Sequence, residues 1–149
     1  MYEAIRMIHG LIRWVVLVDI AVLLAFTFIG WMKAGKWSPR ERVLGLTVTI
    51  LFDIQTLLGL IMYFFLSPVT TSAFSNMGAA MKNKEMRFFA VEHIVLMILA
   101  LVCVHIAAVI SRKTMEDTTK FKKVFLYTAV AFVLILAGNP WFRPLLPGG

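Results

Sequence analysis

The sequence predicts an all-α integral membrane protein, built as an up-down bundle of four transmembrane helices. Two observations lead to this fold class: 60% of the 149 residues are hydrophobic and only 15% are charged, and the mean hydropathy is +0.86. Soluble domains have roughly 45–50% apolar and about 25% charged residues, so the composition excludes an ordinary soluble enzyme. The single cysteine, Cys103, excludes a multi-cysteine zinc or iron–sulfur site and is expected to pack in an apolar run.

Four apolar stretches approach or exceed the roughly 20 residues of helix that cross a bilayer core about 30 Å thick. They run from about 5 to 32, 43 to 66, 88 to 110 and 121 to 138. The second is preceded by Ser38, Pro39 and Glu41, the order of an N-cap, a first-turn proline and a capping-box glutamate. Short connections make neighbouring helices antiparallel. The segment 67–84 lacks apolar periodicity and is predicted to be a loop.

The basic residues predict how these helices are oriented. Nine of the 15 Lys and Arg residues flank the first and third connections, and six lie towards the opposite side. The positive-inside rule places the first group in the cytoplasm and both termini outside. The whole chain, 1–149, is therefore expected to form one multi-pass domain whose partners are lipid and other membrane subunits. No separate basic domain is present to bind nucleic acid.

Polar side chains within the predicted spans are candidates for function, because an ionisable group at membrane depth costs about 2.5–3.5 kcal/mol on insertion scales. They are His9, Arg13, Asp19, Asp53, Gln55, Glu92, His93 and His105. Arg6, His9 and Arg13 share one stripe of the first helix. His9 and His93 each lie four or five residues into apolar segments that run in the same direction, so we expect their imidazoles at one depth.

Two imidazoles at one depth on facing helices are the ligand set of a six-coordinate haem b. We therefore expect His9 and His93 to ligate the iron of one haem near the outer face, with Arg6, Arg13 and Arg87 beside its propionates. A second haem of this type is excluded because the chain has three histidines. The predicted function is electron transfer, with no catalytic residue in the chain itself.

Two other interpretations are open. In a haem-free accessory subunit of a respiratory or photosynthetic complex, Arg13 and Glu92 would form a buried ion pair that joins the first and third helices. In a quinone-binding protein, His105, Asp53 and Gln55 would form the quinone or proton site.

Gly59 is a small residue of the second helix. It is predicted to allow close helix approach or to leave room for a planar ring.

Four groups of residues resemble segments of small four-span bacterial membrane proteins commonly labelled cytochrome B. They are His9-Gly10-Leu11-Ile12-Arg13-Trp14, then Gln55 with Leu58-Gly59-Leu60 and Tyr63-Phe64, then Arg87-Phe88-Phe89-Ala90-Val91-Glu92-His93, and Asn139-Pro140-Trp141. The resemblance implies haem b, electron exchange with quinones or a respiratory partner, and a place in the bacterial inner membrane. The family pattern has a histidine in the second helix, near the position that Asp53 occupies here. This chain lacks that histidine, so the resemblance carries over only His9 and His93 as ligands.

Overall fold

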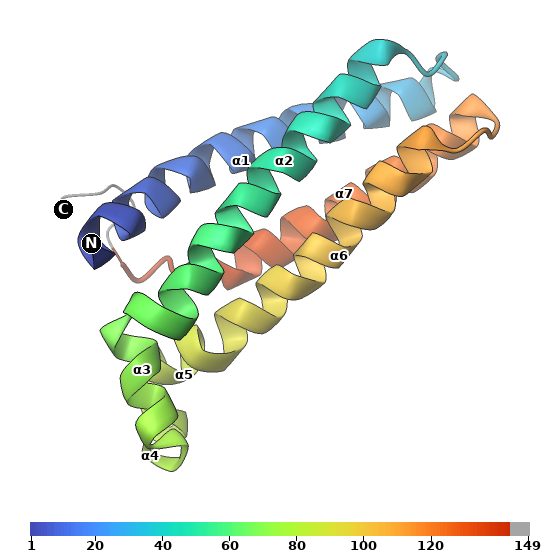
Figure 1. Ribbon diagram of the computed structural model, residues 1–149. Helices are drawn as coiled ribbons and strands as arrows, with labels where there is room; N and C mark the ends of the chain where they lie inside the picture. Colours follow the sequence, from blue (N-terminus) through green and yellow to red (C-terminus); the bar gives the residue numbers. More distant parts are fainter. Residues whose placement is uncertain (144–149) are drawn as a thin grey trace.

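The computed structural model describes residues 1–143, which form a bundle of four long helices with short helices at one end (Figure 1). The elements are α1 (Tyr2–Met32), α2 (Pro39–Ile61), the π-helix η1 (Met62–Leu66), α3 (Pro68–Ser75), α4 (Met77–Lys82), α5 (Lys84–Arg87), the π-helix η2 (Phe88–Glu92), α6 (His93–Arg112) and α7 (Asp117–Gly138). This confirms the predicted all-α four-helix fold.

Within residues 1–143, four helical stretches are long and apolar enough to cross a membrane. They are Tyr2–Met32, Pro39–Leu66, Lys84–Arg112 and Asp117–Gly138. Each contains one of the predicted spans and extends it by up to four residues at an end. The chain is therefore a multi-pass membrane protein whose environment is a lipid bilayer.

The long helices pack as the four corners of a square. α1 packs mainly against α2 and α7, and α6 packs mainly against the same two helices. α1 and α6 therefore occupy diagonal corners, and both run in the same direction along the bundle (Figure 1). Side chains of α1 and α6 that point inwards face a common interior.

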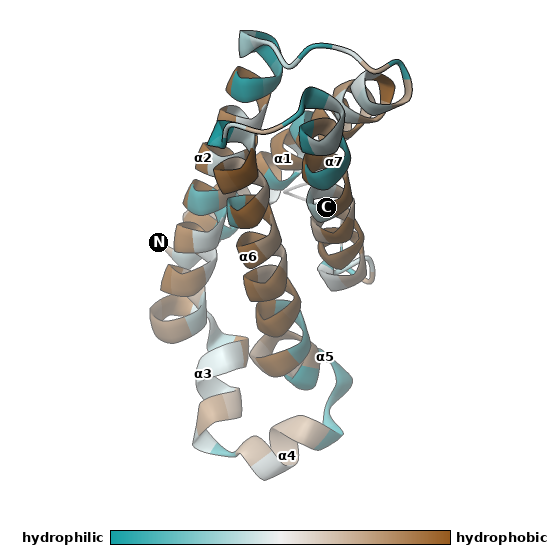
Figure 2. Ribbon diagram, turned by 90° about the vertical axis from the view of Figure 1, so that its right-hand side faces the viewer, coloured by the Kyte–Doolittle hydropathy of each residue, from teal (hydrophilic) through white to brown (hydrophobic). Residues whose placement is uncertain are grey.

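The interior and the outer surface of the bundle are both apolar. Ile20, Val48, Ala100 and Ala131 are buried where the four long helices meet. Outward-facing positions are mostly apolar, and Figure 2 shows hydrophobic colouring along most of α6. A water-soluble bundle has a polar face on each outer helix, so this surface suits hydrocarbon.

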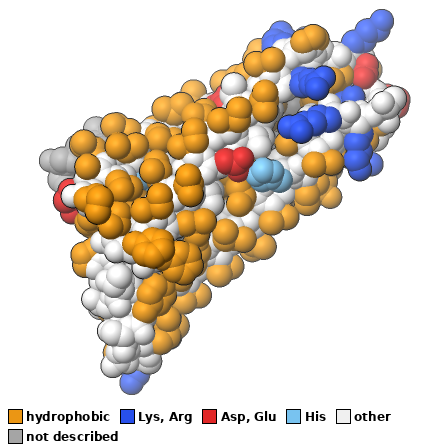
Figure 3. All heavy atoms as spheres, in the orientation of Figure 1, with side chains coloured by type: hydrophobic (Ala, Val, Ile, Leu, Met, Phe, Trp, Pro, Cys, Tyr) orange, Lys and Arg blue, Asp and Glu red, His pale blue; other side chains and the backbone are white. Residues whose placement is uncertain are grey.

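The two ends of the bundle differ in charge. Lys and Arg side chains gather mostly at the end formed by the connections 33–38 and 113–116 (Figure 3). The start of α1 and the short helices α3 to α5 lie at the other end (Figure 1). The C-terminus itself lies outside the described residues.

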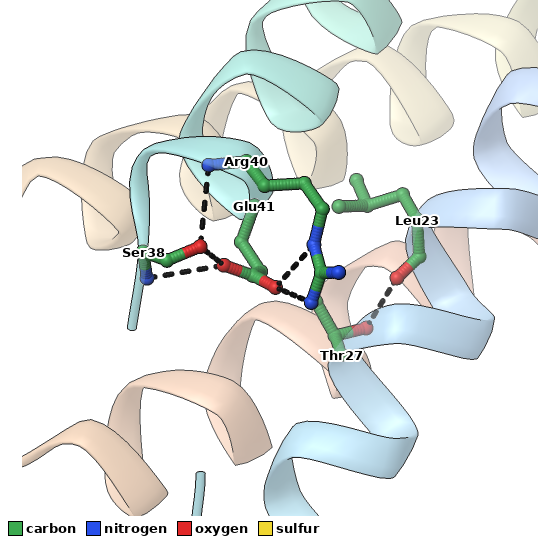
Figure 4. Close-up of polar contacts among 5 residues, drawn as sticks. All are labelled: Leu23, Thr27, Ser38, Arg40 and Glu41. Carbon is green, nitrogen blue, oxygen red and sulfur yellow. Dashed lines mark hydrogen bonds and ion pairs between the residues drawn. The ribbon is translucent and has the colours of Figure 1, made fainter. Parts of the chain in front are cut away.

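The capping box predicted before the second span is present at the basic end (Figure 4). The Ser38 hydroxyl accepts from the backbone amide of Arg40, and the Ser38 amide donates to the buried Glu41 carboxylate at 3.0 Å. The Arg40 guanidinium donates to the same carboxylate at 2.8 Å and lies over the ring of Phe26 on α1. The capping box therefore begins α2, and Arg40 connects the first turn of α2 to α1.

The prediction that 67–84 is a loop is wrong in its local structure, because α3 and α4 are helical. The cause is capping: Ser67 precedes Pro68, and Asn76 and Asn83 each accept from a backbone amide three residues later at 3.0 Å. Caps of this kind support short helices that have no apolar stripe. The Thr70 hydroxyl donates to the Tyr63 carbonyl at 2.8 Å, which attaches α3 to η1.

Candidate functional site

A cavity of about 590 Å³ lies inside the bundle at the end that contains the start of α1 and the end of α7. This volume is within the roughly 300–1,000 Å³ typical of cofactor and ligand sites. Residues from all four long helices line it, including His9, Arg13, Gln55, Gly59, His93, Met97, Gly138 and Asn139. The structure thus brings His9 and His93 to one cavity from diagonally opposed helices.

His93 is held by two features of its surroundings. It follows directly after η2, and the Tyr63 hydroxyl in η1 donates to the Ala90 carbonyl of η2 at 2.8 Å. π-helical turns change the register of a helix and are frequent at functional sites. The imidazole Nδ1 lies 2.7 Å from the Gly138 carbonyl oxygen at the end of α7. Since a carbonyl only accepts, Nδ1 carries the proton and Nε2 keeps its lone pair.

His9 is positioned by α2. The Gln55 amide donates to the His9 carbonyl at 2.8 Å, which fixes the height of α1 against α2. A Cβ added to Gly59 would lie 3.3 Å from His9 Cε1. The lack of a side chain at Gly59 therefore leaves space for the planar imidazole ring of His9. The His9 Nδ1 atom is buried and has no hydrogen-bond partner within residues 1–143.

Three buried polar atoms on cavity-lining residues have no hydrogen-bond partner within the described part of the chain. They are His9 Nδ1, Gln55 Oε1 and Asn139 Nδ2. A buried polar atom left unpaired costs about 1–3 kcal/mol, so such atoms are usually satisfied by water or a ligand. Their concentration at one cavity indicates that its occupant has polar groups as well as an apolar body.

Cationic side chains lie at the same cavity. Arg6, Arg13 and Arg143 line it. Arg13 Nη1 donates to Asn139 Oδ1 at 3.1 Å, which places a guanidinium and an amide side by side. Arg143 was not among the site residues that the sequence suggested. Its position three residues after Asn139-Pro140 is the signal that could have indicated it.

Arg87 does not line the cavity. Its Nε lies 2.8 Å from the carboxylate of Glu92, and both side chains are 44% exposed. Glu92 therefore pairs with Arg87, in place of the Arg13 partner expected in the structural interpretation.

Asp53, Gln55 and His105 do not form one site. Asp53 Oδ1 and His105 Nε2 lie 2.8 Å apart, and both side chains are about half exposed on the outside of α2 and α6. Gln55 is buried and points into the cavity. Two positions along a helix turn a side chain by about 200°, which separates Gln55 from Asp53.

Two further polar or reactive side chains lie apart from the cavity lining. Asp19 has a buried carboxylate oxygen without a hydrogen-bond partner in the described structure. Cys103 is partly buried and packs against the central apolar cluster.

Residues 1–143 contain no group of three or more His, Cys, Asp or Glu side chains that could hold a metal ion. A porphyrin supplies four nitrogen ligands of its own, so its iron needs only one or two from the protein. His9 and His93 are side chains of the type that could supply such ligands at the cavity.

Comparison with known proteins shows no relative: no family model matches, and neither a similar curated protein nor a similar solved structure is found. What the cavity holds is therefore inferred from its own residues.

Proposed function

We propose that the protein is a membrane b-type cytochrome that holds one haem b in the cavity, with His9 and His93 as its two axial ligands. The observation that carries this proposal is the placement of both imidazoles at one interior cavity from diagonal helices. Within residues 1–143, each has a ring nitrogen without a hydrogen-bond partner. In His93 it is Nε2, because Nδ1 bonds to Gly138, and in His9 it is the unpartnered Nδ1.

The polar residues of the cavity suit the remaining parts of the same cofactor. Haem b has an apolar macrocycle and two anionic propionates. Arg13 supplies positive charge, and Asn139 Nδ2, which has no hydrogen-bond partner within residues 1–143, supplies a donor. Arg6 and Arg143 also line the cavity, where they pair with Glu3 and Glu85. Guanidinium groups are well matched to carboxylates because they donate two parallel hydrogen bonds.

When bound, haem b supplies reversible one-electron exchange. The residues of the chain would hold it, keep water from its faces and set its potential through ligand identity and burial. The cavity lies at the end of the bundle away from the basic connections, which the positive-inside rule assigns to the cytoplasm. Electron transfer is therefore proposed at the outer face of a bacterial inner membrane, with quinones or a respiratory subunit as partners.

A quinone is the second candidate occupant of this cavity. Among the described residues 1–143, Gln55 Oε1 is a buried acceptor without a donor, and Asn139 Nδ2 is a buried donor without an acceptor. The hydroxyl groups of a quinol both donate and accept, so one quinol would satisfy both atoms, whereas the carbonyls of the oxidised quinone would satisfy Asn139 Nδ2 alone. This site uses Gln55 without Asp53 or His105, which lie on another surface.

Haem content in three matched histidine variants tests the proposal. The wild-type protein, expressed with haem available and purified in detergent, is expected to contain one haem b per chain. His9→Ala and His93→Ala should lose it, while His105→Ala, which alters a histidine outside the cavity, should keep it. Loss in all three, or haem retained in both cavity variants, would refute the ligand assignment. A haem-free wild type that binds a short-chain ubiquinone through Asn139 would favour the second candidate.

A further inference from the structure

The outer surface of α2 and α6 carries a polar pair well inside the membrane-spanning stretches. Asp53 Oδ1 and His105 Nε2 lie 2.8 Å apart, with side chains 47% and 50% exposed. Figure 3 shows an acidic and a histidine side chain next to each other with apolar side chains around them. Exposed neighbours along the two helices include Ile54, Val102 and Val109. In a bilayer, hydrocarbon would cover this pair unless another protein surface does.

The pair leaves one hydrogen-bonding atom of each residue unused. Within residues 1–143, His105 Nδ1 and Asp53 Oδ2 have no partner. When the pair is ionised, Nδ1–H is a donor and Oδ2 is an acceptor. One surface thus presents a donor and an acceptor of opposite charge, which makes it complementary to itself. A two-fold axis would bring the donor of each copy to the acceptor of the other.

We propose that a second copy of this chain covers this face, so that the protein is a symmetric dimer in the membrane with α2 and α6 at the interface. Lipid tails are as apolar as leucine, so apolar side chains alone give little reason for helices to associate in a bilayer. Hydrogen bonds between helices and close packing supply that reason. The Asp53–His105 pair would provide the hydrogen bonds, and its exposed apolar neighbours would provide the packing. The inference is independent of haem, since the cavity residues lie on the inner faces of the helices.

Counting subunits in lipid vesicles tests this inference. A fluorophore is attached at Lys36→Cys in a Cys103→Ala background, because Lys36 is exposed in the first connection and far from the pair. At high lipid-to-protein ratio, photobleaching should show two fluorophores in each occupied vesicle. Asp53→Leu with His105→Leu should give one. The reciprocal exchange, Asp53→His with His105→Asp, keeps both chemical groups and should restore two.

Far-UV circular dichroism identifies variants that keep the helical fold, and haem content reports separately on the cavity. A monomeric wild type would overturn the proposal. So would a double-leucine variant that dimerises as fully as the wild type, because the pair would then not determine the contact. A wild type that is monomeric alone but retains a different membrane protein through this face would assign the surface to that partner and also overturn the dimer.

Discussion

His93 Nδ1 lies 2.7 Å from the carbonyl oxygen of Gly138, which joins the first residue of α6 to the last residue of α7. The contact depends on close packing of these two helices. A Cβ added to Gly138 would lie 2.6 Å from Met97 Cε and 3.2 Å from Leu96 Cβ. The absence of a side chain at Gly138 therefore allows α7 to reach the imidazole and to select its tautomer.

Gly138→Ala is expected to destabilise the protein by about 1–3 kcal/mol, because the added methyl group overpacks the contact between α6 and α7. Unfolding in detergent, followed by circular dichroism, measures the effect. Gly45→Ala is the matched control, since nothing lies within 4 Å of a Cβ at that helical position. It should be neutral or stabilising by up to about 1 kcal/mol through helix propensity. Equal stabilities for the two variants would contradict this account.

Gly59→Val is expected to lower haem affinity while leaving the bundle folded. A Cβ at this position already approaches His9 Cε1 to 3.3 Å, and the branched side chain would push the imidazole out of place. Removing a group that orients a metal ligand typically costs about 10–100-fold in affinity, and a similar loss is expected here. Haem titration of the haem-free protein measures it. Gly45→Val is the control, and full affinity in Gly59→Val would show that His9 is not a ligand in this position.

The stability of the protein is expected to fall in acid partly because of Glu116, which lies in the connection between α6 and α7. Hydrogen bonds from the Thr119 hydroxyl and amide, and from Thr118, lower the pKa of the Glu116 carboxyl from 4.5 to about 2. A lowered folded-state pKa contributes stability that is present above pH 4.5 and is lost as the pH falls towards 2. Thermal unfolding between pH 6 and pH 3 should therefore show a smaller loss for Glu116→Gln than for the wild type. The same pH dependence in both proteins would exclude this cap as the cause.

The orientation of the protein in the membrane can be tested by labelling cysteine variants from one side. In a Cys103→Ala background, Ser75→Cys and Lys36→Cys place exposed thiols at opposite ends of the bundle. If the basic connections are cytoplasmic, a membrane-impermeant maleimide added to intact cells should modify the Ser75→Cys protein. It should modify the Lys36→Cys protein only after permeabilisation. The reverse pattern would invert the topology and move the cavity to the cytoplasmic side.

The fold could be predicted because composition and length carry most of the information. A membrane helix must satisfy its own backbone hydrogen bonds, so an apolar run of sufficient length leaves few alternatives to a helix. The capping box at Ser38 and Glu41 was equally readable, because its contacts are local in the chain. The parallel directions of α1 and α6 followed from the short connections, and with them the approach of His9 and His93 to one cavity.

The rest of the site could not be predicted because it depends on how the helices are rotated. Helical periodicity places Gln55 and Asp53 on opposite sides of α2, but it does not say which side faces inwards. The hydrogen-bond partner of His93 is a backbone carbonyl, and because every residue has one, the sequence does not indicate which residue provides it. The two π-helices, η1 and η2, shift the register of the chain beside the cavity, and their residue types do not distinguish them from α-helix. Arg143 reaches the cavity only because α7 ends beside it.

The electron paramagnetic resonance spectrum of the oxidised, haem-loaded protein reports the axial ligands of the iron. A low-spin signal typical of two imidazole ligands is expected in the wild type and in His105→Ala. This signal should disappear in His93→Ala. A wild type that takes up no haem, or a bis-imidazole signal unchanged by His93→Ala, would contradict the proposed ligation.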